Sequence, residues 1–298
     1  MAQPVVAVVG AGVVGCSIAY HLARASAGAV RTLLIDPHTL GSGATARSAG
    51  CVLGGSDVPA KCRMVAQTMA DIGALGEGLG FRRTGCLRLA TDDAELASLE
   101  RTAEVTAATL GREEAARTLG REEAAARVGW LECGDGLAAG GLWVADDGVI
   151  DPVVLAGAYL RAARAHGSVE TVPCTASRLL LSSDATPRVT GVEGVEGSQQ
   201  REIAADHTVN AAGAWAGLLL EGLGSLPGLP MAPTRSHYWI SGQQPEIFGA
   251  GGAPEPVVII PGARAYTRPD GQHGCLLGLQ EPASPHYDAR ALPTDPQR

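Results

Sequence analysis

The chain has 298 residues, of which 46% are hydrophobic and 18% charged, a composition that predicts a globular protein with one large core or two intergrown cores. Its net charge of −8, without a cluster of lysines and arginines, argues against nucleic-acid binding and against attraction to an anionic membrane surface. Seven cysteines are scattered singly, so we expect reduced thiols in a cytoplasmic protein and no metal site. We expect neither a signal peptide nor a membrane-spanning helix.

The first elements form a strand, a turn, a helix and a second strand. Val5–Val9 is an apolar run that predicts a buried strand, and apolar positions recur at helical spacing from Val14 until Gly28. A second strand is predicted over Val30–Asp36. This order is typical of the first half of a Rossmann-like sheet.

The turn carries the GxGxxG spacing of a dinucleotide site. Gly10 permits the tight turn, Gly12 lets the backbone approach a pyrophosphate, and Gly15 lets the helix pack closely on the strand. The start of the helix offers its free N–H groups to the anion, at Val13 and Val14.

An acidic residue supports this interpretation. Asp36 ends the second strand, 21 residues after Gly15, where a carboxylate binds ribose hydroxyls. An acid at this position also argues against the 2′-phosphate of NADP. The turn alone leaves FAD and NAD open.

The next segment favours FAD, because an NAD-binding domain usually continues with further strand–helix units. Here the chain enters Gly41–Gly50, a loop of small residues. Its polar side chains are suited to phosphate and ribityl groups, namely Ser42, Thr45, Arg47 and Ser48. A polar surface loop is the alternative.

The remaining elements alternate between helices and short strands. Helices are predicted around Val65–Leu75 and from Pro152 to about His166, the second with Asp151 as its N-cap. A repeat, "TLGREEAAR" at 109–117 and "TLGREEAAAR" at 118–127, predicts a solvated helical surface. Strands are predicted at 85–90, then as a meander near 175–182, 188–196 and 201–205. Residues 207–216 are expected to lead from a strand into a glycine turn, and further strands are predicted near 235–241 and 257–260, ahead of the segment 265–281.

Four of these segments together resemble a known family. "VVGAGVVGCSIAYHLA", "IDP…GSGATARSAG", "GGLWVADDGVIDP" and "TVNAAGAWA" look like the FAD-dependent D-amino-acid oxidase superfamily, which includes glycine and sarcosine oxidases and dimethylglycine and sarcosine dehydrogenases. The resemblance implies oxidation of a C–N bond to an imine, with hydride passing to flavin N5. It also adds three cofactor-binding residues to the turn, Ala212, Gly213 and Trp215.

The resemblance further implies an α/β fold with an α+β substrate part. A Rossmann-like FAD-binding domain with a β-meander is expected over 1–60 and 146–220, intergrown with an antiparallel-sheet substrate domain over 61–145 and 221–298. The partner implied is a small amine or amino-acid substrate; an electron acceptor or a partner chain is left open.

Two further motifs, "TRSHYWI" and "AYTRPDG", look closest to the dimethylglycine/sarcosine branch. By that resemblance His237 and Tyr266 approach the substrate amine as catalytic residues, and Arg268 binds a substrate carboxylate. The alternatives are a structural histidine in a strand and an arginine that caps a hairpin turn at Pro269-Asp270-Gly271.

The sequence departs from the family in two places. Where the branch with covalent flavin has a histidine, this chain has Arg47, so we expect non-covalent FAD, with the guanidinium near the flavin or the pyrophosphate. Family members also continue well past Arg298, which leaves open a fragment, a short gene model or a chain completed by another.

The other functions considered are a non-catalytic or partner-dependent flavoprotein subunit and an NAD-dependent dehydrogenase. The amine, the oxidant and the oligomeric state are not determined by the sequence.

Overall fold

The computed structural model of the chain describes residues 2–128, 130, 139–221, 223, 229–245, 248, 255–279 and 285–292. The chain divides into two compact units, each with its own sheet. Unit 1 comprises Met1–Ser48, Pro152–Arg235 and Pro285–Arg298, and unit 2 comprises Ala49–Asp151 and Ser236–Ser284.

These boundaries differ from the expected ones in four segments. Residues 49–60 and 146–151 belong to unit 2, because β3 (Cys51–Val52) pairs with β7 (Gly148–Val149). Residues 221–235 and 285–292 belong to unit 1, where an isolated bridge joins Thr234 to His286.

Unit 1 is built on a four-stranded parallel sheet in the order β12-β1-β2-β8. The predicted strand–turn–helix–strand unit is present as β1 (Val5–Val9), α1 (Val13–Ala25) and β2 (Arg31–Ile35). The other strands are β12 (His207–Asn210) and β8 (Val169–Val172). The strand β8 was not predicted; it has four residues, lies at the edge of the sheet and has two exposed positions.

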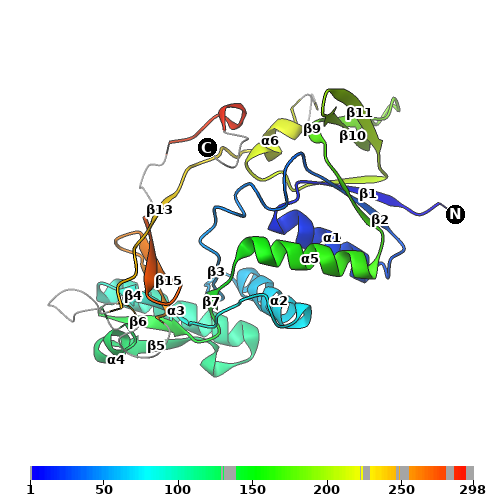
Figure 1. Cartoon of the computed structure of the whole chain (residues 1–298). Helices are drawn as coiled ribbons and strands as arrows, with labels where there is room; N and C mark the ends of the chain where they lie inside the picture. The colour runs from blue at the N-terminus through cyan, green and yellow to red at the C-terminus, as the bar shows by residue number, and fades with distance from the viewer. Residues whose placement is uncertain are drawn as a thin grey trace. The chain divides into compact units, whose positions relative to one another are not determined.

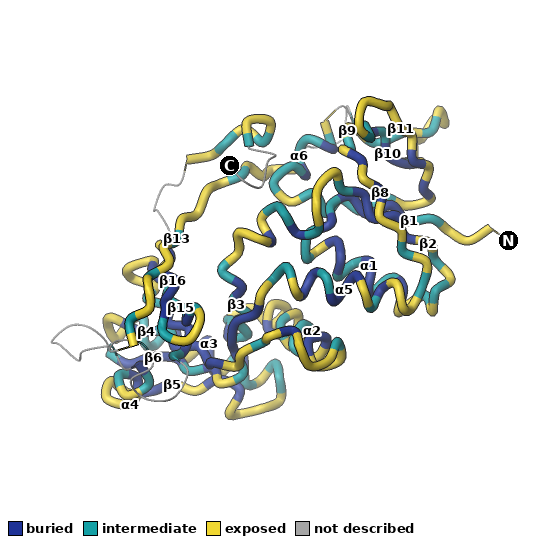
Figure 2. The backbone as a smooth tube through the Cα atoms, in the orientation of Figure 1, coloured by how far each residue is buried: buried dark blue, intermediate teal, exposed yellow. Residues whose placement is uncertain are grey.

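Two helices of unit 1 run side by side, α1 and α5 (Pro152–His166) (Figure 1). Tyr20 of α1 and Tyr159 of α5 place their ring centroids 5.5 Å apart. Figure 2 shows that each helix is buried along one side and exposed along the other. Pro152 begins α5 and His166 ends it, as predicted.

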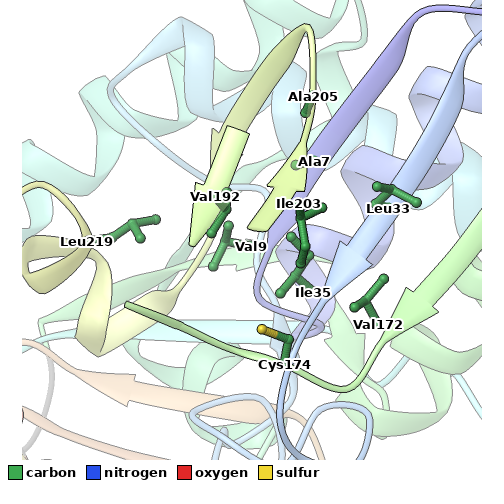
Figure 3. Close-up of a cluster of buried hydrophobic side chains, with 10 residues drawn as sticks. All are labelled: Ala7, Val9, Leu33, Ile35, Val172, Cys174, Val192, Ile203, Ala205 and Leu219. Carbon is green, nitrogen blue, oxygen red and sulfur yellow. The ribbon is translucent and has the colours of Figure 1, made fainter. Parts of the chain in front are cut away.

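The predicted meander forms a three-stranded antiparallel sheet in the order β11-β10-β9. Its strands are β9 (Thr175–Leu181), β10 (Val189–Glu196) and β11 (Gln199–Ala204). Figure 3 shows side chains of the meander packed with those of the parallel sheet in one cluster: Ala7, Val9, Leu33, Ile35, Val172, Cys174, Val192, Ile203, Ala205 and Leu219. Burial of each large aliphatic side chain here contributes about 1.5–3 kcal/mol.

Unit 2 is built on a seven-stranded sheet in the order β13-β16-β15-β14-β4-β6-β5, in which only the β14–β4 pair is parallel. The strands are β4 (Cys86–Ala90), β5 (Arg117–Gly120), β6 (Gly140–Val144), β13 (His237–Ile240), β14 (Val257–Ile260), β15 (Ala265–Asp270) and β16 (Gly274–Leu279). Its helices are α2 (Pro59–Leu75), α3 (Asp93–Leu110) and α4 (Arg121–Ala126). The remaining short helices, η2 (Gly213–Trp215), α6 (Ala216–Leu219) and η3 (Ala289–Ala291), belong to unit 1.

The prediction of a helical surface for the repeat is wrong in part. The first copy ends α3 at Gly111, which has a left-handed φ of 64°, and continues as the short helix η1 (Glu113–Ala115). The second copy begins as β5 and becomes helical only at α4. Pairing with β6 buries Leu119 to 2% exposure. Tertiary packing therefore overrides the helical propensity that the two copies of the repeat share.

Candidate functional site

The glycine turn lies at the carboxyl edge of the parallel sheet of unit 1. Gly10 follows β1 with a φ of 107°, and a Cβ there would lie 2.3 Å from the carbonyl oxygen of Ala211, which follows β12. A Cβ on Gly15 would lie 1.8 Å from the carbonyl oxygen of Gly10. Both positions therefore require glycine. The turn follows β1, whose neighbours β12 and β2 lie on its two sides in the sheet, and open α/β sheets bind ligands at the carboxyl end of a strand in this position.

The loop at Gly41–Gly50 closes on this turn. Thr45 is 8% exposed, and its Oγ1 accepts a 3.0 Å hydrogen bond from the N–H of Val13, the first residue of α1. The N–H of Gly41 donates to the carbonyl oxygen of Ala11 at 3.0 Å. A Cβ on Gly12 would lie 3.0 Å from Thr45 Oγ1. The first turn of α1 therefore keeps its next N–H groups, beginning with that of the exposed Val14, for a ligand.

Asp36 fixes the other side of the turn. Its Oδ2 accepts a 2.7 Å hydrogen bond from the N–H of Ala11, and its Oδ1 accepts a 2.9 Å bond from the N–H of His38. An ionised carboxylate accepts about four hydrogen bonds, so two acceptor positions remain for ribose hydroxyls. Asp36 thus orders the turn and still has acceptor positions for the hydroxyls of a nucleotide's ribose.

The segment after β12 stands beside the same loop. Asn210 donates through Nδ2 to the carbonyl oxygen of Ala216 at 2.9 Å and accepts through Oδ1 from the N–H of Ala212 at 3.2 Å. Gly213 has a φ of 55°, and Trp215 Cζ3 lies 3.8 Å from where a Cβ on Gly43 would stand. By the resemblance, Asn210 begins the segment 210–215 that is expected to contact FAD, and its side chain orders the turn after β12.

The other polar residues of the loop have different surroundings. Arg47 is exposed, and its Nη1 donates to the carbonyl oxygens of Ser42 and, at 3.0 Å, Gly43. Ser42 is half-buried and Ser48 is exposed. The guanidinium is therefore engaged by its own loop.

Together these groups fit the ADP part of a dinucleotide. Glycines that leave no room for a side chain are combined here with amide groups at a helix start and an acid, the latter two with hydrogen-bonding positions left over among the described residues. These are the donors and acceptors that a pyrophosphate and a ribose require. All of them belong to unit 1, as do the contacts above.

In unit 2 the strand register separates two residues that were expected to act together. His237 is aligned with Leu279, which is aligned with Ala265, so these three share one face of the sheet. Tyr266 follows Ala265 and points to the opposite face, and Arg268 lies two residues on, on the same face as Tyr266. The structure therefore places His237, which is exposed, on the other face of the sheet from Tyr266 and Arg268.

Tyr266 lies flat across a glycine of the neighbouring strand. A Cβ on Gly278 would lie 2.1 Å from Tyr266 Cε1 and 2.5 Å from its hydroxyl oxygen. Burial raises the pKa of the Tyr266 hydroxyl, Cys51 and Tyr238 raise it further, and Arg268 opposes them. The hydroxyl therefore stays protonated at neutral pH, in the form that can donate a hydrogen bond.

Arg268 is already neutralised within its own strand. Its Nη1 donates to Asp270 Oδ1 at 3.1 Å and to the carbonyl oxygen of Pro269 at 2.8 Å. The predicted turn at Pro269-Asp270-Gly271 is shifted, because β15 extends to Asp270 and the turn follows at 271–273.

Sequence reasoning missed a buried acid in unit 2. Asp147 is 3% exposed; its Oδ1 accepts from the N–H of Gly54 at 2.7 Å, whereas its Oδ2 has no hydrogen-bond partner within the described residues. Burial raises the pKa of its carboxyl group to about 7, against the lowering effects of the Gly54 N–H and of Arg88. Its place in the "ADDG" turn between β6 and β7 gave no sign of burial.

No group of three or more histidine, cysteine, aspartate or glutamate side chains within the described residues is arranged to hold a metal ion. No helix in the described part of the chain is long and apolar enough to cross a membrane.

Comparison with known proteins identifies the family. A family model described as FAD dependent oxidoreductase (DAO) matches residues 6–298. Mitochondrial dimethylglycine dehydrogenase of Mus musculus is 28% identical over 258 residues, which cover 80% of this chain and 26% of that protein. Mitochondrial sarcosine dehydrogenase of Homo sapiens is 30% identical over 242 residues, which cover 78% of this chain and 24% of that protein.

Solved structures agree on the fold. L-proline dehydrogenase from P. horikoshii superimposes with a TM-score of 0.79 at 23% identity, over 94% of this chain and 70% of that one. The chain spans about a quarter of the length of the curated relatives it matches. The Rossmann-like and antiparallel-sheet architecture that the motifs predicted is confirmed. The chain belongs to the DAO family of FAD-dependent oxidoreductases, whose cofactor is FAD.

Proposed function

We propose that this chain oxidises the C–N bond of an amino acid or an N-methylated amine to an imine. FAD, when bound, supplies the acceptor for the hydride. The observation that carries the proposal is the cradle of Gly10, Gly12, Thr45 and Asp36, in a chain that the family model matches over residues 6–298. The names of the relatives, dimethylglycine dehydrogenase and sarcosine dehydrogenase, support an N-methylated amino acid as the substrate class.

In this proposal unit 1 binds FAD. The first-turn N–H groups of α1 hold the pyrophosphate, and Asp36 binds the adenosine ribose. Thr45 Oγ1 accepts a hydrogen bond from the N–H of Val13 and so orders the loop at Gly41–Gly50 against the turn. Arg47 stands where the covalently flavinylated branch has a histidine, so the FAD is held without a covalent bond.

Unit 2 carries the substrate face, which is the face of the seven-stranded sheet that bears Tyr266. The protonated hydroxyl of Tyr266 donates a hydrogen bond to the substrate and thereby orients the amine. We give His237 no role in the reaction, because its side chain starts from the opposite face of the sheet.

The compartment and the acceptor of electrons are also matters of proposal. Six cysteines of the described chain are unpaired, which supports a reducing, cytoplasmic location. A small acceptor or a partner chain then reoxidises the flavin.

The test is anaerobic titration of the FAD-loaded protein with glycine, sarcosine, dimethylglycine and other secondary and tertiary amino acids. Bleaching of the flavin absorbance by any of them supports the proposal. A protein that binds FAD and is bleached by none of them contradicts it. That result would favour a non-catalytic or partner-dependent flavoprotein subunit.

A further inference from the structure

Two ionisable side chains of unit 2 hold the same pair of glycines. Asp147, in the turn between β6 and β7, accepts a 2.7 Å hydrogen bond from the N–H of Gly54 through Oδ1. Arg88 of β4 donates through Nη2 to the carbonyl oxygen of Gly55 at 2.5 Å. A Cβ on Gly54 would lie 3.2 Å from Asp147 Oδ1. A Cβ on Gly55 would lie 3.9 Å from Arg88 Cζ. The glycines therefore leave room for a carboxyl group and a guanidinium at one dipeptide.

Each of these side chains keeps one buried atom without a partner. Asp147 Oδ2 and Arg88 Nε are buried, and neither has a hydrogen-bond partner within the described residues. The two groups form no ion pair within 4.0 Å, although Arg88 lies near enough to lower the pKa of Asp147. Buried polar atoms are nearly always paired, so an unpaired N–H near an unpaired carboxyl oxygen indicates a second arrangement in which the two bond.

The charge on Asp147 changes near neutral pH. Burial raises the pKa of its carboxyl group to about 7, against the lowering effects of a backbone N–H and of Arg88. The thiols of Cys51 on β3 and Cys86 on β4 interact with it, but burial raises the pKa of both, that of Cys51 to about 11, so both stay neutral. Asp146 of the same turn is partly exposed and is already paired with arginines. An ionised Asp147 is therefore left with Arg88 as its cation among the described neighbours.

The surroundings of the two glycines are fixed on both sides. The carbonyl oxygen of Asp147 accepts a 2.8 Å hydrogen bond from the N–H of Gly85, which anchors the acid at the start of β4. Ser56, which follows the glycines, donates its N–H to Thr106 Oγ1 at 3.1 Å and accepts from the same hydroxyl at 3.2 Å. The parts that can rearrange are the long side chain of Arg88 and the two glycines, which have the widest choice of backbone conformation.

We propose that Asp147 and Arg88 form a switch in unit 2 that a single proton controls. With Asp147 protonated, the guanidinium of Arg88 holds the carbonyl oxygen of Gly55, as in this structure. With Asp147 ionised, the guanidinium pairs with the carboxylate through Nε and releases Gly55. This inference is independent of the proposed amine oxidation.

The two arrangements differ in which group is left without a partner. A protonated carboxyl group offers the guanidinium no more than a backbone carbonyl does, so Arg88 stays on Gly55. A buried carboxylate without a cation is much more costly than a carbonyl oxygen that loses one hydrogen bond. A hydrogen bond between a guanidinium and a carboxylate is also about twice as strong as one between neutral groups. Loss of the proton therefore moves the guanidinium from Gly55 to Asp147.

The switch changes the wall of a cavity. Gly55 and Arg88 both line a cavity of about 360 Å³ that lies wholly within unit 2 and is lined also by Lys61 and Asp57. Transfer of the guanidinium takes a positive charge from this wall to the buried carboxylate, and the glycines are no longer held to β4. The cavity therefore becomes less positive and less rigid when Asp147 loses its proton.

The first test follows the carboxyl proton in the FAD-loaded protein. Infrared difference spectra over a pH series show the carbonyl stretch of a protonated carboxyl group, and the band that Asp147→Asn lacks belongs to this residue. It is expected to vanish with a midpoint no higher than about 7, because the new ion pair favours the ionised form. Arg88→Gln removes the cation and raises the midpoint by at least about one pH unit. The matched control Asp146→Asn keeps the band. An unchanged midpoint in Arg88→Gln, or no such band in the unaltered protein, overturns the switch.

The second test follows the guanidinium by NMR of the same protein labelled with the heavy isotope of nitrogen. The Nε–H signal that Arg88→Lys lacks belongs to Arg88. Arg178, whose Nε donates to Glu193 at 2.9 Å, shows in the same spectrum where a carboxylate-paired signal lies. As the pH rises, the Arg88 signal is expected to move towards that position with the midpoint of the carboxyl band. The amide nitrogen of Ser56 is bonded to the carbonyl carbon of Gly55, so its signal shifts at the same midpoint when that carbonyl loses its donor.

Asp147→Asn is the comparison for both signals, because it keeps an oxygen for the Gly54 N–H but cannot ionise. Neither signal is expected to move in that variant, and movement of either one there overturns the switch. A Ser56 signal that stays in place while the Arg88 signal moves also overturns it, because the guanidinium would then not leave Gly55. Neither test measures flavin bleaching, so each result stands whether or not any amine is oxidised.

Discussion

His237 and Tyr266 start from opposite faces of the seven-stranded sheet, although both were expected beside the substrate. The aligned residues His237, Leu279 and Ala265 define one face, and Tyr266 is the next residue after Ala265. Tyr238 is instead the residue of β13 that shares the face of Tyr266. A shift of one residue in a strand moves a side chain to the other face, so sequence order alone could not settle the pairing.

We therefore predict different effects of two conservative substitutions on substrate oxidation. Tyr266→Phe removes the hydrogen-bond donor and slows anaerobic flavin reduction by about tenfold, the effect of losing one hydrogen bond of ordinary strength. His237→Gln changes the rate less than about twofold, because the residue is exposed on the far face. Stopped-flow reduction with the best amine measures both, and a larger loss in His237→Gln than in Tyr266→Phe contradicts the assignment.

A second prediction concerns the glycine beneath Tyr266. Gly278→Ala places a Cβ about where the tyrosine ring lies, so the ring must move and the free energy of unfolding falls by about 1–3 kcal/mol. The control is Gly242→Ala, where a Cβ meets nothing within 4 Å. Urea unfolding measures both variants. Equal stability of the two would contradict the close approach of the ring to β16.

A third prediction concerns the contact between Thr45 and α1. Thr45→Val removes the acceptor of the Val13 N–H, which costs about 1 kcal/mol and weakens FAD binding about fivefold. Thr68→Val is the matched control, because its hydroxyl donates to the carbonyl oxygen of Met64 within an exposed part of α2. Titration of the apoprotein with FAD measures the affinity, and equal affinities would remove Thr45 from the FAD site.

The mode of FAD attachment gives a fourth prediction. Arg47 supplies no nucleophilic nitrogen for flavin attachment, and it donates to carbonyl oxygens of its own loop. Acid precipitation of the holoprotein is expected to release the yellow colour into the supernatant. Colour that remains in the washed pellet would show a covalent bond at another residue.

The predictability of the fold depended on how local its signals were. The strand–turn–helix–strand unit and the helix from Pro152 to His166 were predicted because their glycines, proline and apolar spacing act within a few residues. The strand β8 was missed, since half of its four positions are exposed and its identity depends on pairing with β2. The prediction for the repeat was wrong in part because the second copy begins as a strand that pairs with β6.

The same distinction applies to the site. Gly10, Gly12 and Asp36 are recognisable from spacing alone, and the structure brings them together with Thr45. The separation of His237 from Tyr266 could not be recognised in the same way, because it depends on the register between β13, β16 and β15, which are far apart in the sequence. Register of this kind is set by the tertiary structure.

The last prediction concerns the buried carboxyl group of Asp147, whose pKa is raised to about 7 in the folded protein from an ordinary 3.8. The folded state holds this proton more tightly than the unfolded chain does. Its contribution to stability is therefore fully present below about pH 4 and is lost as the pH rises through 7. A shift of this size corresponds to a loss on the order of 4 kcal/mol.

Asp147→Asn removes the titration and keeps an oxygen that accepts from the Gly54 N–H. The stability difference between this variant and the unaltered protein is expected to shift in favour of the variant between pH 4 and pH 8. The charged neighbours Arg88 and Asp146 are present in both proteins, so their own effects cancel in the comparison. The control is Asp146→Asn, whose carboxylate is partly exposed and paired with Arg112, and it produces no such shift. Urea unfolding at a series of pH values measures all three proteins. Parallel stability curves for Asp147→Asn and the unaltered protein would mean that Asp147 is ionised throughout this range.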